Sequence, residues 1–123
     1  MNDQRLPKKI ILKSNAAFGR VFLLGQHIHF EYFTIYFVKQ AELRIGFTTK
    51  RGYRNKPERN RMKRILRELW RKKYKQYTLP AHIVLVADGS ILRADYKLLD
   101  NLMETAMFRL EKKLSEMSSE NEK

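Results

Sequence analysis

The stretch that decides the fold runs from Pro57 to Trp70 and reads PERNRMKRILRELW. Pro57 suits the first turn of a helix, where its missing N–H costs no hydrogen bond. Met62, Leu66 and Leu69 then recur at helical spacing and predict one apolar face. The opposite face carries cationic and amide side chains at intervals of four, three, four and four residues, namely Asn60, Arg64, Arg67, Arg71 and Lys75. The segment therefore predicts a helix that packs on one side and presents positive charge on the other.

Most of the excess charge of the chain lies in and around this helix. The 26 Lys and Arg residues outnumber the 13 Asp and Glu residues, so that the net charge is +13 over 123 residues. Residues 50–75 hold +11 of it, whereas residues 1–49 hold +4 and residues 76–123 hold −2. A solvated helix usually mixes charge signs, but here only Glu58 and Glu68 oppose the bases. The pattern favours a nucleic acid as the partner, with an anionic membrane as a minor alternative.

The composition also bounds the domain organisation and the compartment. With 43% hydrophobic residues and no Cys, the chain can bury a core but has no disulfide or thiolate chemistry, which suits a reducing cytoplasm. The apolar run at residues 10–12 is too short for a signal peptide or a membrane span. We expect one cytoplasmic domain over residues 1–114 and a polar tail over residues 115–123 that frays.

Apolar periodicity predicts the remaining elements. They are a helix over 15–24, a short strand near 26–29, strands over 30–38 and 43–49, a buried strand over 83–87 and a last helix capped by Asp95. The short connection at 39–42 predicts a hairpin between the two strands that it joins. The order α-β-β-β-α-β-α indicates an α+β domain, in which a mixed sheet has helices packed mainly against one face.

No constellation of residues in the sequence predicts protein-borne catalysis. His27 and His29 would share one strand face, but without a Cys or a nearby carboxylate they form an incomplete metal site. The chain also lacks a phosphate-binding glycine loop, a nucleophile elbow and a close pair of carboxylates. We therefore predict no catalytic residue, no metal ligand and no cofactor in the protein itself.

Three segments resemble the bacterial ribonuclease P protein family. Residues 58–68, ERNRMKRILRE, resemble its signature Arg-Asn-x-x-Lys-Arg-x-x-Arg-Glu. Residues 44–51, RIGFTTKR, are similar to its strand ending in Ser-Lys-Lys, with Thr49 in place of Ser, and residues 18–25 are similar to its first helix. The resemblance spans roughly residues 10–110, whereas the loop at residues 52–58 departs from the family pattern and is one residue longer.

The resemblance implies a fold, a function and partners. It implies a left-handed β-α-β crossover, although the general rule for parallel strands predicts a right-handed one. It also implies the non-catalytic protein subunit of ribonuclease P, an endoribonuclease in which the RNA subunit performs a Mg²⁺-dependent hydrolysis. The implied partners are this catalytic RNA and precursor tRNA, whose 5′ end is matured.

The family motif further implies two groups of site residues. The RNA-binding group consists of Lys50, Arg51, Arg59, Asn60, Arg61, Lys63, Arg64, Arg67 and Arg71. A cleft for the single-stranded 5′ leader of precursor tRNA is implied at Lys13, Phe18, Phe22 and Tyr36, where aromatic rings would stack on unpaired bases. Judged from the residues alone, the three aromatic side chains are more typical of a core.

The sequence is compatible with three other functions. A ribosomal or other structural RNA-binding protein would share the basic helix without a preference for leader-bearing tRNA. A protein-only nuclease would need a cluster of metal-binding side chains, which the sequence does not show. A helix-turn-helix DNA-binding protein would need a short helix before the basic one, and the pattern there predicts a strand instead.

Overall fold

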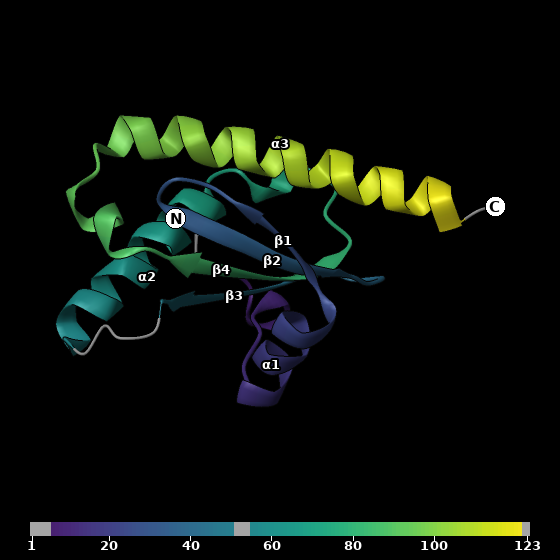
Figure 1. Cartoon of the computed structure of the whole chain (residues 1–123), viewed down its shortest axis with the longest axis horizontal. Coiled ribbons are helices and arrows are strands. Elements are labelled where there is room, and N and C mark those ends of the chain that lie inside the picture. Colours follow the sequence, from purple (N-terminus) through teal and green to yellow (C-terminus); the bar gives the residue numbers. More distant parts are fainter. Residues whose placement is uncertain (1–5, 51–54, 122–123) are drawn as a thin grey trace.

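A computed structural model describes residues 6–50 and 55–121, which form a four-stranded sheet with helices on both faces (Figure 1). The helices are α1 (Asn15–Leu24), α2 (Lys56–Arg71) and α3 (Tyr96–Asn121). The strands are β1 (Gln26–His29), β2 (Phe33–Lys39), β3 (Arg44–Thr49) and β4 (Ala81–Ala87). Short 3-10 helices lie at η1 (Lys8–Ile10), η2 (Tyr74–Gln76) and η3 (Gly89–Arg93). This order confirms the predicted α+β class with a mixed sheet.

The order of strands in the sheet is β1-β2-β4-β3, so the predicted hairpin between β2 and β3 is wrong. β4 lies between these two strands, antiparallel to β2 and parallel to β3. Its continuous apolar run is covered on both faces and needs neighbours on both sides, as a central strand does. The four residues between β2 and β3 reach about 13 Å when extended, whereas two strand spacings amount to about 10 Å. The connection is therefore long enough to pass over β4. The antiparallel hairpin is formed instead by β1 and β2.

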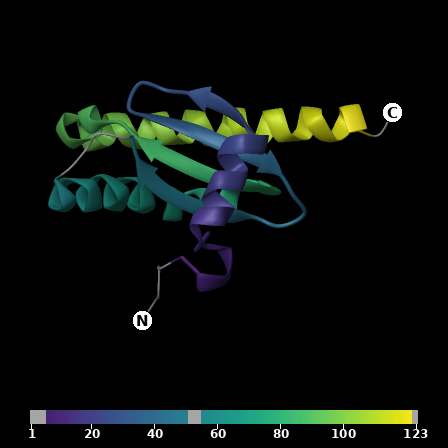
Figure 2. The same ribbon diagram turned by 60° about the horizontal axis from the view of Figure 1, so that its bottom comes forward.

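The crossover from β3 through α2 to β4 is left-handed. Figure 2 looks onto the sheet from the side of α1. In that view the parallel strands β3 and β4 point to the left, α2 lies behind the sheet, and β4 lies above β3. This hand is opposite to the usual one for parallel strands and confirms the expectation from the family resemblance.

Two of the three helices cover one face of the sheet, and α1 covers the other. The main core joins α2 and α3 to the sheet residues Ile35, Ile83 and Leu85, all of which are fully buried. A smaller apolar cluster, which includes Val21 of α1 and Val84 of β4, lies on the opposite face. This second layer places the aromatic side chains of α1 against the sheet.

Side chains that cap the helices fix where they begin. The N–H of Ala17 donates to Ser14 Oγ at 3.0 Å, the N–H of Glu58 donates to Asn55 Oδ1 at 3.2 Å, and the predicted cap Asp95 accepts from the N–H of Leu98 at 3.3 Å. α3 continues past Ser115, where the sequence predicts a fraying tail. Leu114 is buried and Met117 packs on the main core, and these contacts favour the helical conformation there.

Candidate nucleic-acid interface

The outer face of α2 presents several of the predicted RNA-binding side chains to solvent. Its apolar face, with Met62 and Leu66, is fully buried in the core, and this orients the opposite face outwards. Asn60, Arg61, Arg64 and Arg67 are exposed, whereas Arg59 and Lys63 are partly buried. Arg51 lies outside the described residues. The predicted motif is therefore one surface on one rigid element.

A shallow hollow of about 490 Å³ lies along the first turns of α2. Lys56, Pro57, Asn60, Arg61 and Arg64 line this hollow. It lies at the positive end of the helix dipole, where the first N–H groups of the helix also favour anions. The hollow combines guanidinium groups, an ammonium group and an amide, which together suit phosphate oxygens.

Two arginines further along α2 have partners within the protein. The guanidinium of Arg67 lies 5.5 Å from the centroid of the Phe47 ring on β3. Arg71 donates to both oxygens of Glu68, from Nε at 2.9 Å and from Nη2 at 2.7 Å. The hydrogen bond from Arg71 lowers the pKa of Glu68. Arg71 is thus committed to an ion pair, although the sequence predicts it among the RNA contacts.

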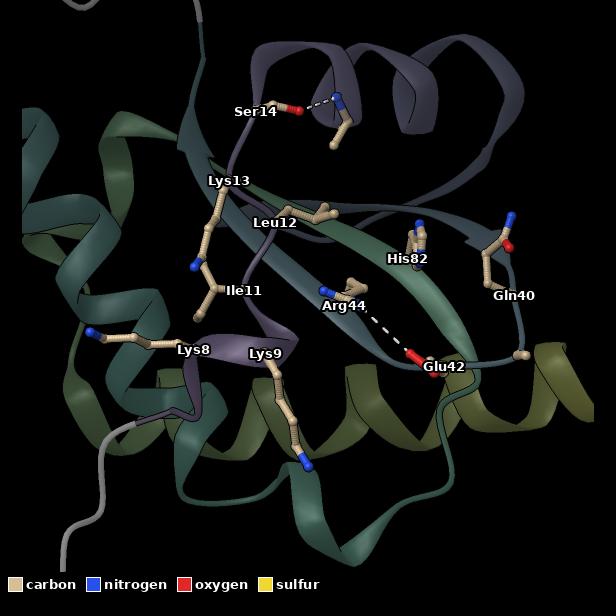
Figure 3. A pocket seen from close by; sticks show the side chains of 12 residues that line it. Lys8, Lys9, Ile11, Leu12, Lys13, Ser14, Gln40, Glu42, Arg44 and His82 are labelled. Carbon is tan, nitrogen blue, oxygen red and sulfur yellow. Dashed lines mark hydrogen bonds and ion pairs between the residues drawn. The ribbon is translucent and has the colours of Figure 1, made fainter.

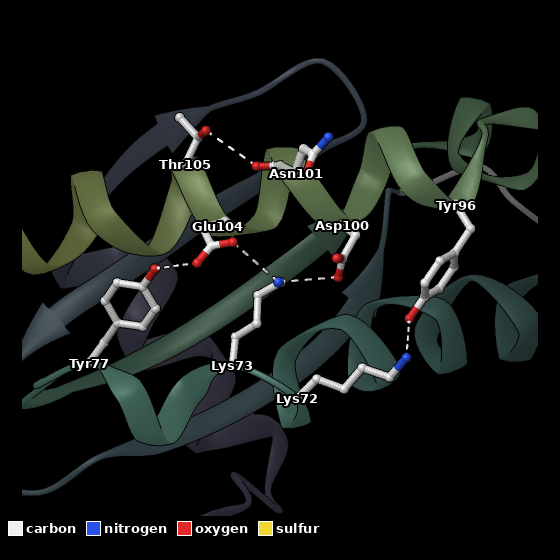
Figure 4. Close-up of polar contacts among 8 residues, drawn as sticks. All are labelled: Lys72, Lys73, Tyr77, Tyr96, Asp100, Asn101, Glu104 and Thr105. Atoms are coloured by element: carbon white, nitrogen blue, oxygen red, sulfur yellow. Dashed lines mark hydrogen bonds and ion pairs between the residues drawn. The ribbon is translucent and has the colours of Figure 1, made fainter.

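Two lysines that directly follow α2 contact side chains of α3 (Figure 4). Lys73 Nζ lies 3.3 Å from Asp100 Oδ1 and 3.5 Å from Glu104 Oε1. Burial of Lys73 opposes its charge, but Asp100 and Glu104 outweigh this effect and raise its pKa. Lys72 Nζ donates to the hydroxyl of Tyr96 at 2.9 Å. Of these two lysines, only Lys73 is paired with carboxylates, whereas Lys72 keeps its full charge beside a neutral hydroxyl.

Lys50 belongs to the predicted RNA-binding group but is also held by an acidic partner. Its Nζ lies 3.1 Å from Asp88 Oδ1, and Ser90 donates to Asp88 Oδ2 from its N–H at 3.0 Å and from its hydroxyl at 2.6 Å. These hydrogen bonds, those of Ser90 first, lower the pKa of Asp88 from 3.8 to about 2. Any phosphate that binds Lys50 competes with this carboxylate.

The Asp88→Asn variant is expected to lower the free energy of unfolding at neutral pH by about 1 kcal/mol, once solvent screening of the partly exposed pair is allowed for. Because the folded-state pKa of Asp88 is depressed, its contribution is present above pH 3.8 and is lost as the pH falls towards 2. Urea unfolding of both proteins between pH 7 and pH 2 measures the difference. A difference that stays constant down to pH 2 would contradict the assignment, and Glu42→Gln, in an exposed pair, serves as a control with little expected effect.

The three predicted aromatic residues meet between α1 and the sheet. The rings of Phe22 and Tyr36 are in edge-to-face contact, with centroids 4.9 Å apart, and Phe22 remains 40% exposed. Phe18 covers Gly46 on β3, where a Cβ atom would lie 2.5 Å from the Cζ atom of Phe18. Gly46 is therefore the residue that lets Phe18 lie flat on the sheet. The ring of His27, which the sequence did not single out for this site, joins the group at 5.3 Å from Tyr36.

Lys13 does not lie with these aromatic residues but in a separate hollow of about 760 Å³ (Figure 3). Lys8, Lys9 and Arg44 line the same hollow, at the end of β3 opposite to the start of α2. Arg44 Nη2 lies 3.5 Å from Glu42 Oε1. Figure 3 shows the side chains of Lys8 and Lys9 pointing away from Arg44, and the ammonium groups of the three lysines lying apart from one another. The hollow therefore adds positive charge beside α1, but its cations do not converge on a single ligand position.

The described residues offer neither a metal site nor a helix suited to a bilayer. Within residues 6–50 and 55–121, no group of three or more His, Asp or Glu side chains is placed to hold a metal ion. In the same part of the chain, no helix combines the length and the apolar character that crossing a bilayer requires. The cationic face of α2 and the aromatic group between α1 and the sheet are the two candidate binding sites.

The fold and these sites define a class of protein: a small basic α+β domain with a cationic face on one helix, a feature typical of proteins that bind polyanions. Residues 6–111 match the family model described as Ribonuclease P, and the chain belongs to that family. Family membership makes it a protein component of the endoribonuclease ribonuclease P and implies an RNA partner.

The relatives and the solved structures agree with this assignment. The ribonuclease P protein component of Coxiella burnetii is 31% identical over 113 residues, which are 88% of this chain and 91% of that protein. The protein component of Nitratiruptor sp. is 29% identical over 102 residues, which are 83% and 93% of the two chains. The RNase P protein of Thermotoga maritima superposes with a TM-score of 0.68 at 24% identity, covering 87% of this chain and 97% of that one. A mutant RNase P protein of Staphylococcus aureus gives a TM-score of 0.71 at 24% identity, covering 85% and 90%. These structural matches confirm the fold.

Proposed function

We propose that this chain binds the catalytic RNA of ribonuclease P through the exposed face of α2 from Asn60 to Arg67 and the 5′ leader of precursor tRNA across Phe18, Phe22 and Tyr36. In this role it assists the 5′ maturation of tRNA in the cytoplasm. Hydrolysis, with its Mg²⁺ ions, is assigned to the RNA.

One observation carries the proposal: both sites meet at the edge strand β3. Arg67 of α2 lies over Phe47, and Phe18 of α1 lies over the preceding residue, Gly46. Successive residues of a strand point to opposite faces, so the two contacts lie on either side of the same strand. An RNA bound along α2 is then separated by the edge strand from Phe18, the member of the aromatic group that lies over β3. A single-stranded leader can pass from one site to the other around this edge.

The chemistry of each site suits its proposed ligand. Guanidinium groups such as those of Arg61 and Arg64 donate in a planar fork that matches phosphate oxygens. Aromatic faces such as those of Phe22 and Tyr36 stack on unpaired bases with little regard to sequence. The protein would thus hold substrate and catalytic RNA together while tolerating different leader sequences.

Cleavage of a precursor tRNA at low magnesium, by a bacterial ribonuclease P RNA with and without this chain, tests the proposal. We expect strong stimulation, because the cations of α2 replace part of the Mg²⁺ that screens RNA phosphates. We also expect tighter binding of leader-bearing than of mature tRNA. RNA binding without stimulation and without leader preference would instead favour a structural RNA-binding protein.

A further inference from the structure

Two histidines of the edge strand β1 lie on the same face of the sheet as the aromatic group. The register of β1 and β2 pairs His27 with Tyr36 and His29 with Thr34. Directly opposed residues of antiparallel strands point to the same side, which here is the side of α1. Both histidines are exposed. The surface formed by Phe22 and Tyr36 therefore continues onto β1.

Packing of the core does not account for these two side chains. Ile28, which lies between them and points to the other face, is the β1 residue that packs on the main core. At an exposed position of an edge strand, packing does not require an aromatic side chain. The ring of His27 nevertheless lies beside that of Tyr36, with an angle of 33° between their planes. Phe22, Tyr36 and His27 thus form a row of three rings.

The contact of His29 fixes which of its ring nitrogens faces a ligand. Its Nδ1 lies 2.9 Å from the hydroxyl oxygen of Thr34. When this hydroxyl donates to Nδ1, the proton of the neutral imidazole is on Nε2, which then donates to an acceptor outside the protein. A phosphate or carbonyl oxygen of a nucleotide is such an acceptor.

We infer that His27 and His29 extend the leader-binding surface across β2 onto β1. This inference rests on the proposed function. His27 supplies a stacking face for one more unpaired base, and His29 Nε2 donates a hydrogen bond to the same segment of the strand. The leader then runs from the β3 edge of the sheet towards its β1 edge, crossing beside Tyr36.

The experiment uses the full chain reconstituted with a bacterial ribonuclease P RNA, and it measures the dissociation constants of a precursor tRNA and of the mature tRNA. His27→Ala is expected to weaken binding of the precursor about fivefold or more, because a base loses its stacking partner. Binding of mature tRNA should be unchanged. His27→Phe should restore binding of the precursor, and His29→Ala should weaken it to a smaller extent.

Gln26→Ala is the matched control, because Gln26 is exposed on the same strand and its side chain faces Met117 of α3. It should bind both RNAs as the wild type does. If Tyr36→Ala weakens precursor binding and His27→Ala does not, the inference is overturned while the proposed function stands. Equal losses for precursor and mature tRNA would also overturn it. If the wild type shows no leader preference, the proposed leader site fails, and the inference fails with it.

Discussion

Replacing both Arg64 and Arg67 with glutamine is expected to weaken the binding of ribonuclease P RNA about 100-fold. Both side chains are exposed on the outer face of α2, and each charge-assisted hydrogen bond to a phosphate contributes about 1.5 kcal/mol or more. Each lost phosphate contact should also lower the slope of log affinity against log salt concentration by about 0.7 to 0.9. Filter binding over a series of salt concentrations measures both quantities.

The matched control is the variant Lys112→Gln with Lys113→Gln, which removes the same charge from exposed positions of α3. If binding depended only on the net charge of +13, both double variants would lose affinity equally. We expect the α3 variant to keep most of its affinity and its salt slope. Equal losses would contradict the assignment of the RNA site to α2.

Elements that depend on local sequence could be predicted well. α2 begins within one residue of Pro57 and carries its apolar and cationic faces as the spacing predicts, because helical periodicity is a local property. Asp95 caps α3 as predicted, and α1 covers the predicted residues 15–24 and ends before Gly25, where a Cβ atom would lie 2.5 Å from the carbonyl oxygens of Phe37 and Val21. Local signals of this kind need no knowledge of what packs nearby.

The order of the strands could not be predicted as easily, because strand pairing joins residues that are distant in sequence. A four-residue connection between β2 and β3 is compatible with a hairpin and also with a step across β4. The decisive signal was the continuous apolar run of β4, which marks a central strand. The family resemblance, and not the general rule, gave the hand of the crossover.

Which residues belong to the candidate site also depends on contacts between segments that are distant in sequence. The sequence shows Lys73 as one more cation after α2, yet Asp100 and Glu104, which neutralise it, lie about 30 positions further along the chain. Lys13 lies near Phe18 in sequence, but the turn into α1 places it in the hollow with Lys8 and Lys9. His27 joins Tyr36 only through the pairing of β1 with β2. In each case the partner comes from another element.

Replacing Trp70 with alanine is expected to lower the free energy of unfolding by about 3 to 5 kcal/mol. Trp70 is the largest fully buried side chain, and its ring is stacked on Tyr74 with centroids 6.4 Å apart. A small domain has about 5 to 15 kcal/mol of stability in total, so this loss is a large part of it. Urea unfolding followed by circular dichroism measures the change.

Trp70→Phe is the control for the size of the cavity. The indole Nε1 has no hydrogen-bond acceptor among the residues that the structure describes, so phenylalanine loses ring volume without losing a hydrogen bond. We expect it to cost about 1 to 2 kcal/mol. A loss below about 1 kcal/mol for Trp70→Ala would contradict the packing of α2 described above.

The Trp70 and arginine variants also separate the two roles of α2. Trp70 lies on its buried face, and Arg64 lies on its exposed face. Trp70→Ala should reduce RNA binding only by the fraction of protein that unfolds, and the salt slope of the folded fraction should stay unchanged. The arginine double variant should lower the slope while the free energy of unfolding changes by less than about 1 kcal/mol. If Trp70→Ala lowered the salt slope as well, the two faces of the helix would not act independently, and α2 would have to change its position on the RNA when its packing is lost.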